Sequence, residues 1–207
     1  KKLVAWYVDK KIYLYVGIGA LIILIASVYF LISGFKPAKS REIPQPNGWK
    51  VDSNGYLSYP LDRGNVTFRR DDYGVEGNLT LHKIIYQSRN GNVYGLLVLP
   101  TTAPELLPGI VLLPGAGVSK EIELKLAKKI AALDAAVFVI DQRGVGETTG
   151  KLNTVERDYA DFSKENEPTQ HLMVYDALRA YDLMKSAPFI DSGRVMLAGE
   201  SLGGRIA

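Results

Sequence analysis

Residues 199–203 read GESLG, a G-x-S-x-G pattern that would place a nucleophilic serine, Ser201, on a sharp turn. The apolar run RVMLAG ends at the start of this pattern, and the polar and small residues SLGGRIA then open a predicted helix. Small residues beside such a serine avoid clashes with the strand before it and the helix after it. The pattern therefore predicts that Ser201 projects its hydroxyl from a strand end and attacks a carbonyl carbon. A tight turn with an ordinary serine is the alternative interpretation.

The sequence PGAG at residues 114–117 follows a second apolar run, GIVLL. Glycines at this place would let the backbone approach a carbonyl oxygen of a substrate. We expect the backbone N–H groups of Ala116 and Leu202 to form an oxyanion hole for the charge that develops on that oxygen. The alternative interpretation of this stretch is a plain loop before a helix.

A third glycine-rich stretch, DQRGVGETTG at residues 141–150, follows the apolar run AVFVI. Its glycines permit turns, and its charged residues could bond to the loop itself. We expect Asp141 and Arg143 to hydrogen-bond within the loop and to shape the rim of a pocket, rather than to take part in catalysis.

A serine hydroxyl needs a base to react at neutral pH, and the sequence has only two histidines, His82 and His171. His82 falls in a predicted hairpin and His171 near the start of a predicted helix, so we expect neither to serve Ser201. The absence of cysteine excludes disulfides and thiolate metal sites, and two histidines are too few for a typical histidine-rich metal site. The composition therefore argues against metal sites of these two kinds.

The three motifs each follow a predicted strand, in a chain that alternates strands and helices from about residue 79. The predicted strands cover residues 79–87, 92–100, 109–113, 136–141 and 194–199, and the predicted helices cover residues 119–135, 168–186 and the stretch from 201. This alternation predicts an α/β fold, with a mostly parallel sheet and helices on both faces. Ligands of such sheets bind at the carboxyl ends of the strands, where all three motifs fall.

The motifs VLLPGAG, VIDQRGVGETTG and GRVMLAGESLGGRIA, in this order and spacing, resemble the α/β-hydrolase superfamily. More narrowly, they are similar to its dienelactone-hydrolase and prolyl-oligopeptidase-like branches, over about residues 79–207. The resemblance implies an eight-stranded sheet, Ser201 as nucleophile, Ala116 and Leu202 as oxyanion donors, and no metal or organic cofactor. Pro114 departs from the pattern, because many relatives carry a histidine there; we interpret this as a difference in the pocket wall.

In this superfamily the acid and the histidine follow the serine along the chain. The resemblance therefore implies that both lie beyond residue 207, and that residues 78–207 are the N-terminal half of a hydrolase domain cut after the nucleophile turn. We expect these 207 residues alone to be inactive, as part of a longer enzyme.

Residues 12–35 form a run of 24 residues without a charge, long enough to cross a hydrocarbon core of about 30 Å. Aromatic residues lie near both ends of the run, as in interfacial belts. The run predicts an uncleaved transmembrane helix in the lipid bilayer, after a flank at residues 1–11 and before a Pro- and Gly-containing stalk at residues 36–77. A cleaved signal peptide is the alternative, but its apolar region would be shorter.

The N-terminal part of the chain, which contains the apolar run, and the predicted hydrolase domain differ in charge. Residues 1–75 hold 11 Lys and Arg against 6 Asp and Glu, whereas residues 76–207 hold 14 against 16. The positive excess thus flanks the apolar run, which favours a membrane surface and not nucleic acid as partner. Positive residues are balanced across the run, so orientation rests on the sequons at Asn65 and Asn78, which favour an extracytoplasmic domain.

The sequence therefore predicts a membrane-anchored serine hydrolase that cleaves an ester, thioester or amide of a small molecule or peptide through an acyl-enzyme on Ser201. A non-catalytic, membrane-anchored binding or adhesion protein with the same fold is the alternative. The short distance between the anchor and the first predicted strand leaves no room for a propeller domain there, which favours a compact esterase over an oligopeptidase.

Overall fold

The computed structural model describes residues 48–102 and 106–207 of the chain. No helix within these two ranges is long and apolar enough to cross a membrane. The predicted anchor at residues 12–35 and the flank before it lie outside the described residues, so the membrane helix stays a prediction.

The described residues belong to two compact units. In residues 50–58, strand β1 (Lys50–Val51) pairs antiparallel with β2 (Leu57–Ser58). Residues 59–207, together with Gly48 and Trp49, belong to the other unit, which contains all of the predicted site residues. The fold of this second unit positions the site and is described below.

A six-stranded sheet lies at the centre of this unit, in the order β3-β4-β5-β7-β6-β8. Its strands are β3 (Phe68–Glu76), β4 (Leu79–Ser88), β5 (Gly91–Pro100), β6 (Leu107–Leu113), β7 (Ala136–Ile140) and β8 (Ile190–Gly199). Neighbours run antiparallel from β3 to β7 and parallel from β7 through β6 to β8. The predicted opening hairpin is confirmed as β4 and β5, but the sheet is mixed and not mostly parallel, because the hairpin joins β7 antiparallel.

Strand β3 forms where the sequence predicts an irregular stalk. It pairs with β4 along its whole length, with a register shift between Asp72 and Gly74. Its sequence, FRRDDYGVE, shows no alternation of apolar and polar residues, because all but one of its residues are exposed at the sheet edge. The sheet therefore begins before residue 78, the predicted start of the hydrolase domain.

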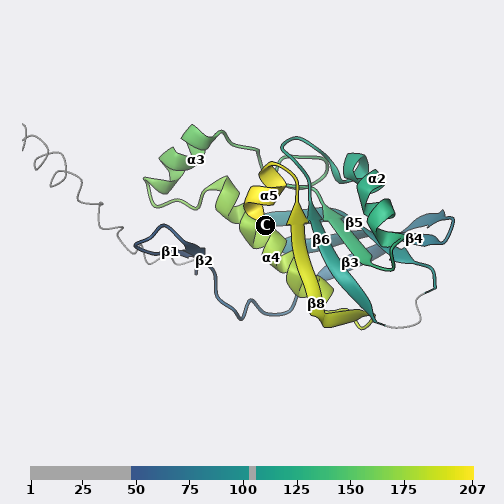
Figure 1. Cartoon of the computed structure of the whole chain (residues 1–207). Coiled ribbons are helices and arrows are strands. Elements are labelled where there is room, and N and C mark those ends of the chain that lie inside the picture. Colours follow the sequence, from purple (N-terminus) through teal and green to yellow (C-terminus); the bar gives the residue numbers. More distant parts are fainter. Residues whose placement is uncertain (1–47, 103–105) are drawn as a thin grey trace, which may run out of the picture. The chain divides into compact units, whose positions relative to one another are not determined.

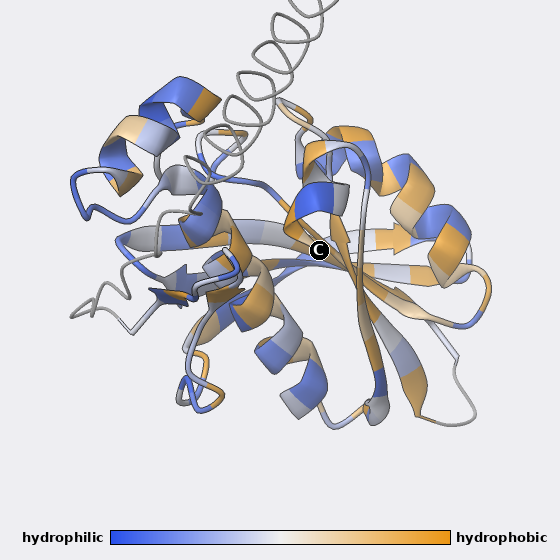
Figure 2. Ribbon diagram, turned by 60° about the vertical axis from the view of Figure 1, so that its left-hand side comes forward, coloured by the Kyte–Doolittle hydropathy of each residue, from blue (hydrophilic) through white to orange (hydrophobic). Residues whose placement is uncertain are grey.

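Helices cover both faces of the sheet, as predicted, and β7 shows why. All five of its residues are buried, and successive side chains point to opposite faces. Val137 and Val139 join the core beneath α2 (Lys120–Ala131), whereas Phe138 and Ile140 join the core beneath α4 (Thr169–Ser186). Figure 2 shows hydrophobic residues concentrated in the strands between these helices.

Helix α2 confirms the helix predicted from residue 119, and its most buried face consists of small residues. Ala127 and Ala131 are fully buried against β5 and β7, whereas Ile122 is 67% exposed and Leu126 is 41% exposed. Small alanines let the helix lie close to the sheet. The apolar spacing of Ile122 and Leu126 thus indicates the helix correctly without marking its core face.

The carboxyl ends of the three parallel strands lie at one edge of the sheet, as Figure 1 shows for β6 and β8. The loop at residues 114–117 follows β6, the loop at 141–150 follows β7, and the short helix α5 (Leu202–Ile206) follows β8. The three predicted motifs therefore meet at this edge, which is the usual location of a ligand site in such sheets.

Candidate active site

Ser201 lies on a sharp turn between β8 and α5. Its φ of 52° and ψ of −112° fall in a region that costs a non-glycine residue about 1–3 kcal/mol. The turn is held to β6 by a hydrogen bond of 3.2 Å from the Glu200 amide to the Leu113 carbonyl oxygen. The side chain of Ser201 is exposed, so this backbone presents the hydroxyl to a ligand instead of burying it.

The glycines on both sides of Ser201 are required by close backbone contacts. A Cβ atom at Gly203 would overlap the carbonyl oxygens of Leu113 and Pro114, and a Cβ atom at Gly199 would overlap the backbone of Gly203. These contacts press the start of α5 against the end of β6. The spacing of the two glycines is therefore explained by the packing of the turn.

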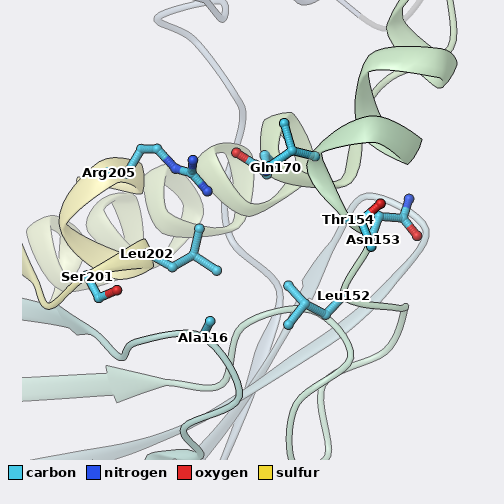
Figure 3. Close-up of a pocket in the computed structure, with 9 residues that line it drawn as sticks. Ala116, Leu152, Asn153, Thr154, Gln170, Ser201, Leu202 and Arg205 are labelled. Carbon is cyan, nitrogen blue, oxygen red and sulfur yellow. The ribbon is translucent and has the colours of Figure 1, made fainter.

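The loop at residues 114–117 lies next to the serine. A Cβ atom built on Gly115 would be 3.8 Å from Ser201 Cβ and 3.8 Å from the Glu200 carbonyl oxygen. Ala116 and Ser201 also line one cavity of about 480 Å³, together with Leu202. Figure 3 shows the Ser201 hydroxyl on the side of this cavity that Ala116 and Leu202 share.

The structure thus brings together all three predicted site residues. Within the described ranges, the backbone N–H groups of Ala116 and Leu202 donate no hydrogen bond. Leu202 is the first residue of α5, where an amide has no partner inside its own helix. Both groups are therefore available to a negatively charged oxygen, the role that the sequence predicts for them.

Asp141 and Arg143 are buried, and each has a structural role. Asp141 accepts hydrogen bonds from the Lys120 amide at 2.7 Å, the Lys120 Nζ at 2.8 Å and the Glu147 amide at 3.1 Å. Arg143 instead reaches out of its loop, to both carboxylate oxygens of Asp176 on α4, each at 2.8 Å. Asp141 thus bonds within its loop, as expected, and also to the start of α2, whereas Arg143 does not match this expectation and ties the loop to α4.

Lys120 is 1% exposed, although it carries a charge. Burial lowers the pKa of its ammonium group, but hydrogen bonds to Asp141, Glu121 and Glu147 raise the pKa by more, so it stays above its ordinary value. The protonated lysine joins the start of α2 to the end of β7. This network fixes the loop at 141–150 beside the candidate site.

Gln142 is a residue of the site that the sequence prediction missed. Its Nε2 donates a hydrogen bond of 2.5 Å to the Pro114 carbonyl oxygen, and the side chain is buried. Its Oε1 is also buried and has no hydrogen-bond partner among the described residues. Gln142 therefore holds the loop that carries Ala116. In the sequence, the only sign of this role is that Gln142 follows a buried strand.

The opposite wall of the cavity comes from residues 152–155, which lead into helix α3 (Val155–Phe162), and from Gln170 at the start of α4. The sequence prediction also missed α3. Asp158 joins the two, because its carboxylate accepts hydrogen bonds from the amides of Thr169 and Gln170, both at 2.9 Å. It also accepts one of 3.1 Å from Asn153 Nδ2. This single buried carboxylate fixes two residues that line the cavity, Asn153 and Gln170.

Neither described histidine lines the cavity. His82 lies on β4, with Nδ1 3.2 Å from Asp72 Oδ1. His171 packs edge-on against Trp49, with ring centroids 5.0 Å apart. Burial lowers the pKa of both imidazoles. Ser201 Oγ makes no hydrogen bond within the described ranges, and these ranges contain no cluster of three or more side chains suited to a metal ion.

Comparisons with known proteins agree with this geometry. The family model of acetyl xylan esterase (AXE1) matches residues 61–207. Among solved structures, the acetyl xylan esterase from Paenibacillus sp. R4 is 20% identical with a TM-score of 0.56, covering 69% of this chain and 48% of that protein. Acetyl xylan esterase 1 from Thermoanaerobacterium sp. JW/SL YS485 is 14% identical with a TM-score of 0.60, covering 69% and 47%.

A dienelactone hydrolase-like promiscuous phosphotriesterase from metagenomic libraries also matches, at 20% identity and a TM-score of 0.50, covering 63% of this chain and 52% of that protein. No curated protein matches the chain. The chain spans about half the length of the structures that it matches. At these identities the solved structures show only the fold, which is that of the α/β-hydrolases. The family model shows the family, because it matches most of the chain. This chain therefore belongs to the acetyl xylan esterase (AXE1) family of the α/β-hydrolase superfamily.

Proposed function

We propose that this protein is a serine esterase that forms an acyl-enzyme on Ser201. The observation that carries the proposal is the placement of the strained Ser201 in one cavity with Ala116 and Leu202, whose amides are unused in the described part of the chain. Such an arrangement fits an ester whose carbonyl carbon meets the hydroxyl and whose carbonyl oxygen meets the two amides.

In the proposed reaction, Ser201 Oγ attacks the carbonyl carbon, and the carbonyl oxygen becomes negatively charged. The amides of Ala116 and Leu202 donate hydrogen bonds to this oxygen, each lowering the barrier by about 3–4 kcal/mol. Collapse of the intermediate expels the alcohol and leaves the acyl group on Ser201. Water then attacks this ester, releasing the carboxylic acid and restoring the serine.

The reaction needs a base for the serine proton, and we assign this role to a histidine that is oriented by an acid, as in the superfamily. The order of the superfamily supports this, since the nucleophile precedes both partners. His82 and His171 are excluded from this role by their positions outside the cavity.

The family match favours an ester over a thioester or amide, and an acetylated carbohydrate of the xylan type as a substrate. The cavity suits such a substrate, because Asn153, Thr154 and Gln170 place polar groups beside Leu152 and Leu202. Acetyl release from acetylated xylan, compared with hydrolysis of peptide amides, would separate the esterase from a peptidase.

We also propose that residues 12–35 anchor the enzyme in a membrane, with the esterase on the extracytoplasmic side. The uncharged length of this segment and the sequons at Asn65 and Asn78 support this location. Removal of residues 1–35 is expected to move the protein from the membrane fraction to the soluble fraction. Retention in the membrane fraction would contradict the anchor.

The nucleophile is tested by treating the full-length protein with a fluorophosphonate probe, which reacts with activated serines. We expect one labelled residue, Ser201, and we expect Ser201→Ala to abolish both labelling and ester hydrolysis while leaving the melting temperature within a few degrees. Folded wild-type protein without label would contradict the esterase, and would favour the non-catalytic binding protein that remains the alternative.

A further inference from the structure

Arg205 lies one helical turn after the candidate nucleophile. Its amide donates a hydrogen bond of 3.1 Å to the Ser201 carbonyl oxygen, which is the first helical bond of α5. Residues four apart in a helix lie on the same side. Arg205 accordingly lines the same cavity as Ser201, and Figure 3 shows its side chain extending from α5 toward Gln170.

The charge of Arg205 has no balancing carboxylate in this cavity. The nine residues that line the cavity include no Asp or Glu, and Arg205 is the one charged residue among them. Within the described ranges Arg205 forms no ion pair and its guanidinium donates no hydrogen bond, whereas Arg143, Arg63 and Arg194 are each paired with an aspartate. Glu200, although next to Ser201, is not part of the lining.

The rest of the lining is a mixture of apolar and neutral polar residues. Leu152, Val155 and Leu202 supply apolar surface, while Asn153, Thr154 and Gln170 supply neutral polar groups, of which Gln170 lies on the side of Arg205 in Figure 3. An ester that carries a negatively charged group near its carbonyl would therefore meet the one charged side chain of the lining, Arg205. A guanidinium binds planar carboxylates and phosphates through two parallel hydrogen bonds.

We infer that Arg205 makes this enzyme selective for esters that carry an anionic group, a carboxylate or a phosphate, close to the ester carbonyl. The predicted selectivity in catalysis rests on the proposed esterase function. The predicted binding of an anionic group rests on the cavity alone. Arg205 would hold the anionic end while Ser201, one turn away, meets the carbonyl carbon. Neutral esters of the same size would lack this hydrogen-bonded ion pair.

The test uses three acetate esters of matched shape with the full-length enzyme: 3-acetoxybenzoate, 3-acetoxyphenyl phosphate and the neutral methyl 3-acetoxybenzoate. We expect kcat/KM to be at least about tenfold higher for one or both anionic esters than for the neutral ester. Arg205→Gln is expected to remove this preference by lowering kcat/KM for the anionic esters to about that for the neutral ester, and Arg205→Lys to restore part of it. The ratio between the two anionic esters identifies carboxylate or phosphate as the preferred group.

Arg194→Gln is the matched control, because it removes the same charge from an exposed arginine on β8 that lies outside the cavity. It should leave the preference unchanged. Equal rates for all three esters in the wild type, or a preference that survives Arg205→Gln, would overturn the inference while leaving the esterase intact.

A binding measurement separates this inference from the esterase proposal. In Ser201→Ala protein, which cannot form the acyl-enzyme, calorimetry should show tighter binding of an anionic ester than of the neutral one, and Arg205→Gln in that background should abolish the difference. If wild-type Ser201 takes no fluorophosphonate label but this binding difference is present, the esterase proposal fails and the anion site stands. If Ser201→Ala protein binds all three esters equally, the anion site fails.

Discussion

At the scale of single residues, the candidate site depends on a few groups that hold others in place. The amides of Ala116 and Leu202 can donate to a charged oxygen only if their loop and helix keep a fixed separation. Gln142 contributes to this, because its side chain donates to the Pro114 carbonyl oxygen from a buried position at the end of β7. We expect loss of this hydrogen bond to destabilise the transition state more than it weakens substrate binding.

Gln142→Ala tests this positioning role. Removing the hydrogen bond to Pro114 would free the loop at residues 114–117, and a small displacement of an oxyanion donor is costly. We expect kcat for an acetate ester to fall about tenfold to a hundredfold with little change in KM, since the interaction concerns charge that is present only in the transition state. Steady-state kinetics on full-length enzyme measure both constants.

The control for this variant is Gln87→Ala, which removes an exposed glutamine of β4 that lies outside the cavity of Ser201. Its kinetic constants should match those of the wild type. A purely structural role for Gln142 would instead lower the melting temperature while leaving kcat per folded molecule unchanged, and that result would contradict the prediction.

The sequence predicts some residues of this site and misses others, and the difference has a physical reason. Ser201, Ala116 and Leu202 follow from glycine spacing, because glycines mark places where the backbone itself approaches another group. Gln142 and Asp158 act through side-chain hydrogen bonds to distant backbone, between residues 28 positions apart for Gln142 and Pro114. No local pattern in the sequence records such a contact.

At the scale of elements, the turn between β8 and α5 and the end of β6 behave as one packed junction. The start of α5 lies against the Leu113 and Pro114 carbonyls, with no space for a side chain at Gly203. Any added atom there must push α5 away from β6. Since Ser201 belongs to one side of the junction and Ala116 to the other, the junction sets their separation.

Gly203→Ala is therefore expected to damage both stability and activity. Overpacking of this kind costs about 1–3 kcal/mol of the free energy of unfolding, and displacement of Ser201 should lower kcat/KM by at least about a hundredfold. Urea unfolding and ester hydrolysis measure the two effects. Gly193→Ala on β8, where a Cβ would meet its nearest atom at 3.4 Å, is the control and should change neither property much.

The sequence predicts those strands and helices whose burial leaves a recognisable pattern of apolar residues. Strands β5, β6 and β7 are apolar because both of their faces are covered, and α2 and α4 show helical spacing. Strand β3 was missed because an exposed edge imposes no alternation, and its residues are mostly charged or polar. Helix α3 was missed because it is short and mostly exposed, with Asp158 as its one fully buried residue.

At the scale of the larger unit, the described histidines make stability depend on pH. Burial lowers the pKa of His171 below its ordinary value of 6.5, against a smaller opposing effect of Asp158. The native state therefore prefers the neutral ring, and the unfolded state binds more protons between the two pKa values. The contribution to stability is complete above pH 6.5 and is lost as the pH falls through the lower, folded-state pKa.

His171→Phe should weaken this dependence, because phenylalanine keeps the ring that packs against Trp49 and Phe162 but cannot bind a proton. We expect the free energy of unfolding of the variant to fall less than that of the wild type between pH 7.5 and pH 5.5. Urea titrations at the two pH values give the comparison, in which the effects of His82 and the carboxylates are common to both proteins. Equal losses in the two proteins would show that protonation of His171 does not contribute.

The hydrogen bond from Glu200 to Leu113, and the contact of Gly203 with the same carbonyl, have a consequence for how the proposed esterase could diversify. They join the Ser201 hydroxyl and the amides of Ala116 and Leu202 into one rigid unit, whereas α3 and the residues before it belong to a separate wall held by Asp158. Substitutions in that wall can reshape what enters the cavity without disturbing the spacing on which bond cleavage depends. Substitutions in the wall held by Asp158 would thus change which substrates bind, while the groups proposed to carry out the reaction stay the same.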